Sequence, residues 1–391
     1  MDAFIGVVEF ILLVIGGLLI LTFLVVIHEL GHAIVARRNG VVVEEFGIGF
    51  PPRAWGKKLK NGVLFSLNWL PLGGFVKLKG EHDEATGKGS YGSASMWQKS
   101  KILLAGVTMN WLFAAFIFMI LSVVGLPKLL PNQFEVAGGT TTKTSAVTID
   151  EVGDKTPAAK LGLKVNDKIT QVNGVAIKDS DQLRALTKKD AGQTVEVTYQ
   201  RGKATFTKAV TLNPASKAQH GYLGVSTSEK ATVYTAWWAS PIEGVGLTAQ
   251  FSWETIKGLG VLLAQLGQGI ASKFVPDHTV QQNGQVALDA AGAGVSGPVG
   301  ILFNLFPTFE KAGIIPLLVL TAIISLTLAV MNVLPIPALD GGRLYLALVF
   351  KALKKRLTKE REEKIVGYSF YALLLLVLFI TILDVGKFFT H

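Results

Sequence analysis

Four apolar stretches of membrane-spanning length constrain most strongly how this chain can fold. They cover about residues 4–27, 102–126, 314–333 and 365–385. Each has roughly twenty residues or more, the length of helix that crosses a hydrocarbon core about 30 Å thick. Because no water pairs with the backbone at that depth, we expect each stretch to be an α-helix. The chain is therefore predicted to be a polytopic α-helical membrane protein.

The composition agrees with this prediction and removes several classes of function. Half of the 391 residues are apolar, and the mean hydropathy of +0.43 is too high for an ordinary soluble protein of this length. There is no cysteine, which excludes disulfides, a thiolate nucleophile and a cysteine-based zinc site. Many basic residues behind the net charge of +10 lie beside the apolar stretches, so they indicate membrane topology and not a nucleic-acid partner.

Basic residues also set the predicted orientation. The connections 39–101 and 344–364 are rich in lysine and arginine, so both are expected on the cytoplasmic side, with the termini and the long middle segment outside. The first stretch lacks a basic start and a small-residue cleavage site, so we expect a retained helix, continuing to about Arg37. The predicted segments are a first transmembrane helix in 1–38, a cytoplasmic β region in 39–101, a second helix in 102–126, a soluble domain in 134–228, an interfacial helical region in 229–312, a third helix in 313–343, a basic loop in 344–364 and a fourth helix in 365–386.

The first cytoplasmic connection is predicted to contain strands. Residues 41–50 and 63–70 are rich in β-branched and aromatic side chains, and a turn-rich segment with Pro51, Pro52 and Gly56 separates them. Residues 72–78 add another short strand. A sheet can lie at membrane depth only where protein covers its backbone or where it lines a wet cavity.

The segment 134–228 is predicted to be an inserted α+β domain outside the cytoplasm. Strands are expected at 146–149, 169–174 and 195–199, the second ending in an Asn-Gly turn, with short helices at 157–163 and 180–187. This order, with Leu161-Gly162-Leu163 shortly before Asp167-Lys168-Ile169, resembles a bacterial PDZ domain.

Residues 242–270 form a fifth apolar stretch that is predicted to lie in the membrane interface. The stretch mixes apolar residues with charged and amide side chains, as amphipathic interfacial helices do. If it crossed the membrane, the third helix would run the other way and the basic loop after it would lie outside. The polar residues are Glu243, Gln250, Glu254, Lys257, Gln265 and Gln268.

The segment His28-Glu29-Leu30-Gly31-His32 fits a zinc-binding pattern. Residues four apart share one face of a helix, so His28 and His32 can reach the same metal ion. Glu29 adjoins the first histidine and can take a proton from a metal-bound water. The alternative is a polar helix end where a span leaves the membrane, but ionisable residues at membrane depth are costly and usually functional.

A third protein ligand is needed, and Asp340 is the better candidate for it. In residues 332–342 an apolar span breaks at Pro335 and Pro337 and ends in Asp340, followed by Gly341 and Gly342. The prolines block ordinary helix and the glycines allow close approach of backbone. The alternative is a solvated aspartate at a helix end. The other histidines are expected at the surface: His82, His220, His278 and His391.

These motifs together resemble the site-2 protease family of intramembrane zinc metalloproteases, specifically the bacterial regulator-of-sigma-E protease branch with one PDZ domain. The likeness covers nearly the whole chain. The residues that carry it are His28-Glu29-Leu30-Gly31-His32, Gly73-Gly74-Phe75-Val76, Ser296-Gly297-Pro298-Val299-Gly300-Ile301 and residues 332–342.

The resemblance implies a Zn²⁺ ion held by His28, His32 and Asp340, with Glu29 as the general base. Zinc polarises the scissile carbonyl and its bound water attacks, while Glu29 relays a proton to the leaving amine. A helical substrate hides that carbonyl in its own hydrogen bonds, so the substrate must unwind locally before it is cut.

The resemblance also implies residues that handle the substrate. Asn332 is expected to hold the extended substrate backbone, with a helix–helix hydrogen bond as the alternative. Asn110 matches a second family asparagine, although Val107 stands where the family often has proline, which weakens that match. The segment Gly73-Gly74-Phe75 resembles a membrane-associated β-hairpin that engages unwound substrate; the alternative is a plain surface hairpin.

The segment Tyr222-Leu223-Gly224-Val225 resembles the carboxylate-binding loop of PDZ domains. Leu223 and Gly224 are therefore candidates to bind a C-terminus left by an earlier cut, through exposed backbone N–H groups. The alternative is a domain that acts as a size filter with no affinity for peptide.

The family implies substrates that are transmembrane proteins, either membrane-bound anti-sigma factors or remnant signal peptides. It also implies a multi-pass protein of the bacterial inner membrane, with the lipid bilayer as partner and the PDZ domain outside the cytoplasm. Two other classes of function stay open. A non-catalytic scaffold would not need Glu29, and a transporter would usually show internal repeats, which we do not find in the sequence.

Overall fold

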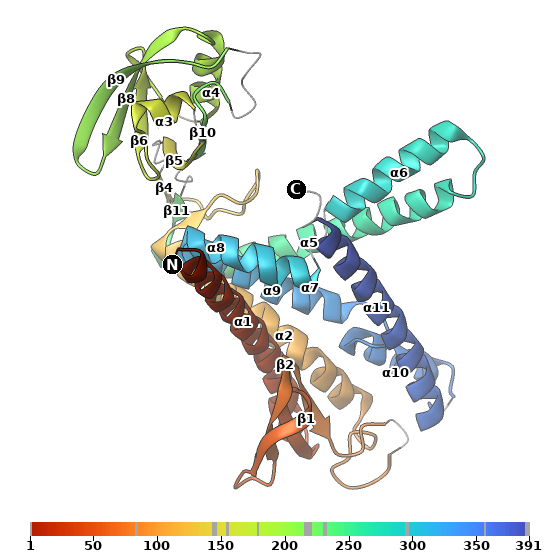
Figure 1. Cartoon of the computed structure of the whole chain (residues 1–391). Coiled ribbons are helices and arrows are strands. Elements are labelled where there is room, and N and C mark those ends of the chain that lie inside the picture. Colours follow the sequence, from red (N-terminus) through yellow and green to blue (C-terminus); the bar gives the residue numbers. More distant parts are fainter. Residues whose placement is uncertain are drawn as a thin grey trace. The chain divides into compact units, whose positions relative to one another are not determined.

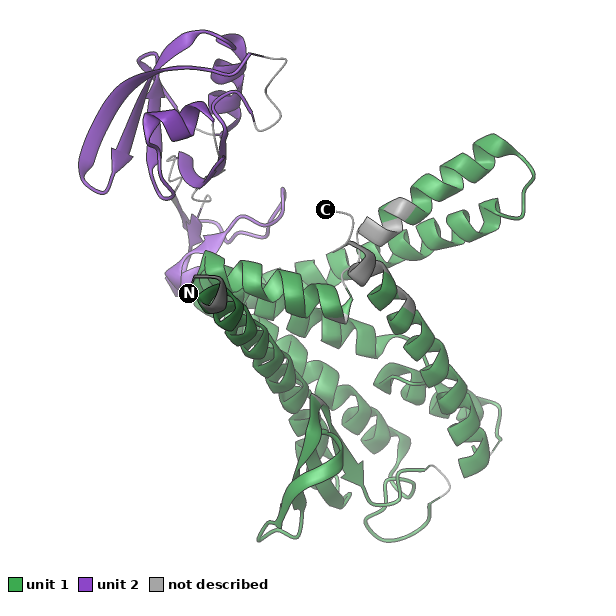
Figure 2. Ribbon diagram, in the orientation of Figure 1, with its two compact units in different colours: residues 1–121, 239–391 green, residues 122–238 purple. Residues whose placement is uncertain are grey.

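The computed structural model describes residues 2–82, 85–142, 147–153, 156–177, 180–214, 221–229, 233–293, 297–355 and 357–387. The chain divides into two compact units, the first made of Met1–Leu121 with Ala239–His391 and the second of Ser122–Trp238 (Figure 2). Parts of several predictions lie outside the described residues, namely Ala146, His220, Ser296 and His391.

Among the described residues, four helices are long and apolar enough to cross a membrane, over Ile5–Arg38, Met96–Val124, Ile314–Val333 and Lys359–Ile382. This confirms the four predicted apolar helices in length and composition. Large apolar side chains of the first helix stay exposed, as in Leu12 and Leu19, which is typical of a surface that contacts lipid. The helices are α1 (Asp2–Arg38), α2 (Met96–Val124), α9 (Ile314–Val333) and α11 (Lys359–Lys387).

The predicted third helix and the predicted loop after it differ from the structure. The third helix ends at Val333, and a separate helix, α10 (Asp340–Ala352), occupies much of the segment 344–364. The loop prediction is wrong there because α10 is amphipathic and buries Leu344 and Ala347 in the first unit. The helix α11 begins at Lys359, earlier than predicted, and Lys359 pairs with Glu363 one turn later at 3.8 Å.

The predicted β region is a hairpin of β1 (Val43–Lys58) and β2 (Leu64–Leu78). Residues 43–48 pair with 74–78 on one side and with 64–67 on the other, and 53–58 pair with 64–68. The predicted turn is confirmed at Pro51 and Pro52, because residues 45–48 run in the same direction as 64–67 whereas 53–58 run opposite to 64–68. Gly56 lies beyond this reversal and pairs with Ser66, so its place in the turn is wrong. Gly49, at the start of the reversal, has φ +78°, and its carbonyl accepts a hydrogen bond from the Asn68 amide at 3.1 Å.

The segment 229–312 contains two long helices, α5 (Ser240–Ser272) and α6 (His278–Ala293), which lie side by side (Figure 1). The helix α5 covers the predicted amphipathic stretch and is not among the span-like helices. Its first part packs on α2, where the rings of Phe118 and Phe251 stack at 5.4 Å. Its later part exposes large apolar side chains such as Leu263 and Ile270. Short helices α7 (Pro298–Gly300) and α8 (Phe306–Ala312) lead into α9.

The second unit has an α+β core, and its predicted strands and helices are confirmed where they are described. The order of the main sheet is β10-β5-β6-β8-β9, with β7 (Val175–Ala176) also paired to β6. Its core includes Ile149, Val197 and Tyr199, each at most 1% exposed. The remaining bounds are β5 (Val147–Val152), α3 (Pro157–Leu161), β6 (Lys168–Val172), α4 (Ser180–Lys189), β8 (Thr194–Arg201), β9 (Ala204–Thr211) and β10 (Val225–Glu229), with a small sheet of β3 (Leu126–Pro127), β11 (Val233–Thr235) and β4 (Thr140–Thr142).

Candidate metal centre

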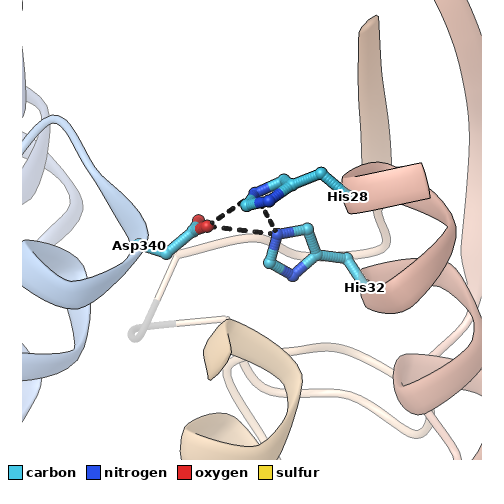
Figure 3. Close-up of side chains that lie close together, drawn as sticks. All are labelled: His28, His32 and Asp340. Atoms are coloured by element: carbon cyan, nitrogen blue, oxygen red, sulfur yellow. Dashed lines mark hydrogen bonds and ion pairs between the residues drawn. The ribbon is translucent and has the colours of Figure 1, made fainter. Parts of the chain in front are cut away.

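Three side chains that are far apart in the sequence meet in the first unit. His28 and His32 project from one face of α1, and Asp340 is the first residue of α10 (Figure 3). The Nε2 atom of His28 lies 2.9 Å from Oδ2 of Asp340, and Nε2 of His32 lies 3.2 Å from the same oxygen. The two Nε2 atoms are 3.1 Å apart. The helical spacing that predicts a shared face therefore also brings both nitrogens to one carboxylate.

This triangle of donor atoms has the dimensions of a zinc site. Ligand bonds of about 2.0–2.2 Å in a tetrahedron place neighbouring ligand atoms about 3.3–3.6 Å apart. The separations of 2.9, 3.1 and 3.2 Å are slightly shorter, so a small outward movement accommodates the ion. Two imidazoles and one carboxylate are also the donor set of many catalytic zinc sites, which leave a fourth position open for water. The residues present therefore fit Zn²⁺.

A second hydrogen bond orients one of the histidines. The Nδ1 atom of His32 donates to the backbone carbonyl of Ile102 on α2, at 2.7 Å. That bond places a proton on Nδ1 and makes Nε2, which faces Asp340, the nitrogen that can bind a metal ion. Among the described residues, Nδ1 of His28 has no hydrogen-bond partner.

Asp340 reaches the histidines because the chain breaks between α9 and α10. The helix α9 ends at Val333, Leu339 is extended with φ −107° and ψ 162°, and α10 then begins. The predicted helix break at Pro335 and Pro337 is confirmed. Asp340 lies at a helix N-terminus, where the backbone dipoles favour an anion.

The ionisation of Asp340 suits a metal ligand. Burial alone would raise the pKa of Asp340, but hydrogen bonds from His28 and His32 outweigh it and hold that pKa well below its usual range. The side chain is therefore a carboxylate at neutral pH.

Sequence reasoning did not identify the part that Gly106 plays at this centre. A Cβ atom at Gly106 of α2 would lie 2.5 Å from Nε2 of His32 and 2.6 Å from Nε2 of His28. Only glycine leaves room for both imidazoles at this point. Gly341 and Gly342 are also confirmed as close approaches, because a Cβ at either would strike the backbone carbonyl of Val333 or Ile336. Gly106 directly precedes Val107 in the segment that carries Asn110, but its contact partners belong to another helix.

Glu29 faces a cavity of about 210 Å³ beside the three donor side chains. Its carboxylate accepts a hydrogen bond from the backbone N–H of Val76 on β2. A Cβ built at Gly74 would lie 3.6 Å from Cγ of Glu29, so the strand passes close to this side chain. The cavity is lined by Glu29, His32, Phe75, Val76, Leu78, Glu81, Tyr91, Ile102, Leu103, Asp340 and Arg343.

The other predicted substrate residues lie in different surroundings. Phe75 lines the cavity, and Gly73 has φ +84° and packs against the ring of Phe50. Asn332 donates to the carbonyl of Leu328 in its own helix at 2.9 Å, and it is not among the lining residues.

Asn110 is fully buried, and within the described chain its side-chain amide has no hydrogen-bond partner. The backbone carbonyl of Asn110 accepts a hydrogen bond from Ser325 Oγ on α9 at 2.9 Å, so this part of α2 faces α9. Leu223 and Gly224 belong to the second unit and line a separate groove there of about 470 Å³.

The remaining described histidines are not at the centre. His278 is exposed, as predicted. His82 is only one-third exposed, and its ring lies 3.8 Å from Glu362 and 3.6 Å from Glu363 on α11, so the surface prediction for it is only partly right.

Comparison with known proteins identifies the family. Residues 16–377 match peptidase family M50. A candidate zinc metalloprotease of Campylobacter jejuni is 30% identical over 392 residues, covering 94% of this chain and 92% of that protein. A similar protein of Clostridium perfringens is 29% identical over 381 residues, covering 95% and 98%. The regulator of sigma-W protease RasP of Bacillus subtilis is 26% identical over 460 aligned positions, covering 96% and 99%.

A small part of the chain is similar to a solved structure. A PDZ domain of an SdrC-like protein from Listeria monocytogenes covers 22% of this chain and 93% of that one, with 25% identity and a TM-score of 0.20. The sequence match across nearly the whole chain and the three converging donor side chains lead to one conclusion. This chain belongs to peptidase family M50, the site-2 protease family, and is a zinc metalloprotease.

Proposed function

We propose that this protein is an intramembrane protease that hydrolyses peptide bonds in or near transmembrane segments, with zinc held by His28, His32 and Asp340. The observation that carries the proposal is the meeting of these three donor atoms at the end of a span-like helix, next to Glu29. A zinc site in an apolar helix is costly unless it serves chemistry at that depth.

The residues of the metal centre and its surroundings have separate tasks in the proposed reaction. His28, His32 and Asp340 would hold the zinc ion, which would supply a Lewis acid and a more acidic water. Glu29 takes a proton from the attacking water and passes it to the leaving amine. The N–H of Val76 holds the Glu29 carboxylate in place for both transfers.

The strand segment 74–78 is the proposed holder of unwound substrate. It pairs with 43–48 on one side only and lines the metal cavity with Phe75, Val76 and Leu78. An extended segment can add to such an edge through backbone hydrogen bonds. This gives Gly73, Gly74 and Phe75 their proposed part in substrate binding, because glycine keeps the strand close to Glu29.

For the two asparagines the contacts favour different proposals. Asn332 lies on the last turn of α9, close in sequence to the metal-bearing segment, and is proposed to contact the substrate backbone after leaving its bond to Leu328. Asn110 is proposed to contact substrate only when α2 and α9 separate, because its amide is buried between helices.

The proposed location is the bacterial inner membrane, with 39–101 and 344–364 in the cytoplasm and the second unit outside. The basic residues of those two segments support this orientation. The proposed substrates are membrane-bound anti-sigma factors or remnant signal peptides. The name of the Bacillus subtilis relative ties that protein to regulation of sigma-W, and we extend this class of substrate to the present chain.

For the second unit we propose PDZ-type recognition of a C-terminus. The groove lies between β10, an end strand of its sheet, and α4, and Leu223 and Gly224 form its loop. An extended peptide can add to β10 with its carboxylate on the N–H groups of that loop. A size filter without peptide affinity is the second candidate. Tight binding of a free C-terminal peptide over its amide by the full-length protein supports recognition, and equal affinities support the filter.

Hydrolysis is tested on the purified full-length protein with a model transmembrane peptide, with zinc quantified in every sample. Glu29→Gln should keep its zinc while the rate falls about 100- to 10,000-fold, the usual worth of a general base. Glu9→Gln is the matched control, an exposed acid at the other end of α1 that pairs with Lys311 at 3.4 Å. Equal cleavage by wild type and Glu29→Gln would overturn the mechanism, and full activity in a zinc-free preparation would overturn the metal assignment.

A further inference from the structure

Strand segment 74–78 has one edge that lacks a partner strand among the described residues, and two carboxylates accept hydrogen bonds from the N–H groups of that edge. The N–H of Lys79 donates to Val42 on the β1 side at 2.9 Å. Because backbone N–H groups alternate along a strand, those of Val76 and Leu78 point to the opposite edge. No strand pairs with that edge in the part of the chain that the structure describes.

The first of these carboxylates is Glu29, which accepts from Val76 and has its task in the proposed reaction. The second is Glu81. Its Oε1 accepts from the N–H of Leu78 at 3.0 Å, and its side chain lines the same cavity. Nothing in the hydrolysis assigned to this centre uses Glu81, so its position on the edge needs its own explanation.

The backbone of Glu81 is hydrogen-bonded to α10, the helix that begins with Asp340. Arg343 of α10 donates from Nη2 to the carbonyl of Glu81 at 3.3 Å and lies 3.6 Å from Glu362 of α11. Arg343 follows Asp340 by one turn and also lines the cavity. The backbone carbonyl of Glu81 is therefore anchored, and its carboxylate shares the cavity with the guanidinium of Arg343.

We propose that Glu81 is a displaceable cap on the substrate-binding edge and that it sets specificity. The proposal rests on the proposed function of segment 74–78 as the holder of extended substrate. In the free enzyme Glu81 occupies the N–H of Leu78 that a substrate carbonyl would take. A substrate must displace the side chain to pair beyond Val76, and Arg343 then offers the carboxylate a new partner.

This cap has a definite consequence for substrate choice. When a substrate pairs as far as Leu78, the hydrogen bond between Leu78 and Glu81 breaks. A carbonyl of the substrate must then accept from the N–H of Leu78 in its place. A substrate segment that unwinds far enough to reach Leu78 offers a free carbonyl and makes up for the lost hydrogen bond. A segment that stays helical there has no free carbonyl and does not. The enzyme therefore favours segments that unwind over several residues past the metal.

The test compares Glu81→Ala, which removes the cap, with Glu81→Gln, whose amide oxygen still accepts from Leu78. A labelled transmembrane peptide of about 25 residues is titrated into the metal-free full-length protein in detergent, so that binding is measured without cleavage. We expect Glu81→Ala to bind about 3- to 10-fold more tightly than wild type, the worth of about one net hydrogen bond, and Glu81→Gln to fall between them. With zinc bound, KM should fall in the same order while kcat stays close to wild type.

Glu44→Ala is the matched control, because it removes one acid from the same sheet without touching the free edge. Glu44 is paired with Lys77 at 3.8 Å and its side chain is 44% exposed. Its affinity for the peptide should equal that of wild type. Hydrogen exchange gives a second measurement: the amide of Leu78 should exchange faster in free Glu81→Ala and regain protection when the peptide binds.

The outcomes separate this proposal from the hydrolysis proposed above. If Glu81 only stabilises its turn, Glu81→Ala will have a lower Tm with unchanged or weaker peptide affinity, and the cap is overturned. If wild type binds the peptide without cutting it while Glu81→Ala binds more tightly, the cap stands and the proposed hydrolysis fails.

Discussion

Within the described residues, a strand edge faces a cavity in each unit, and the two edges differ in what occupies them. The edge at 74–78 lies against a cavity of about 210 Å³ and its outward N–H groups are held by Glu29 and Glu81. The edge of β10 lies against a groove of about 470 Å³ beside α4, where the side-chain hydroxyl of Thr227 donates to the hydroxyl of Ser180 at 3.1 Å.

This difference shows how one backbone device can serve two purposes. An edge closed by carboxylates beside a metal centre admits substrate only by exchange, which suits a site that performs chemistry. A wider edge with a glycine loop and neutral hydroxyls offers a peptide ready-made N–H groups, which suits binding without chemistry. The predictions below test this division of tasks.

The largest effect is expected from removing the carboxylate ligand. Asp340→Ala should lose bound zinc and reduce hydrolysis by more than the roughly 10- to 100-fold that outer-shell changes cost. Zinc content measured by elemental analysis and peptide cleavage are the readouts. Glu360→Ala, an exposed acid on the first turn of α11, is the control and should keep both. Retention of one zinc per chain by Asp340→Ala would show that the ligand is elsewhere.

A smaller effect on the same centre is expected from Gly106→Ala. The added methyl group must push both imidazoles away from the metal position, so we expect zinc affinity and hydrolysis to fall about 10- to 100-fold. Competition with a chelator measures the affinity. Gly258→Ala on α5 has open space around the new Cβ and should match wild type. Wild-type zinc affinity in Gly106→Ala would mean that α2 does not confine the site.

The groove of the second unit should respond to Gly224→Ala. Gly224 has φ +79° and a Cβ there would strike the side chain of Thr156, so the loop must shift. We expect affinity for a peptide with a free C-terminus to fall about 3- to 10-fold, measured by fluorescence anisotropy. Gly221→Ala carries the same backbone strain at φ +80° without the clash. If both variants bind as wild type does, the loop does not hold the carboxylate.

The smallest effect is an acid-side loss of stability in the second unit. Burial would raise the pKa of Asp167, but Arg201, at 2.6 Å, and the N–H of Lys164 outweigh it and hold that pKa below its usual range. A lowered pKa in the folded state adds stability above the unfolded pKa, and the added stability is lost as pH falls through the folded value. Hydrogen exchange of the amides in β6 and β8, corrected for the intrinsic exchange rate, reports on this unit alone and should show less protection toward acid pH. Arg201→Gln should weaken that dependence, and an unchanged pH profile in the variant would contradict this assignment.

Much of the fold could be predicted from the sequence because its signals are local. The span-like helices are long apolar runs, and the short strands and helices of the second unit have their own patterns. The reversal at Pro51 and Pro52 followed from their local turn preference, whereas Gly56 was assigned to the turn because its pairing with Ser66 of β2 is not a local signal. The helix α10 was missed because basic residues were interpreted as a loop.

The sequence by itself determined the chemistry of this protein. His28 and His32 lie one turn apart on one helix, so their shared face follows from helical periodicity alone, and Glu29 adjoins the first of them. Only the tertiary structure decided that Asp340 meets these histidines, that Gly106 leaves them room and that Glu81 covers the edge beside them. The physical reason is that each of these contacts joins separate elements, and packing, not local pattern, sets the distance between them.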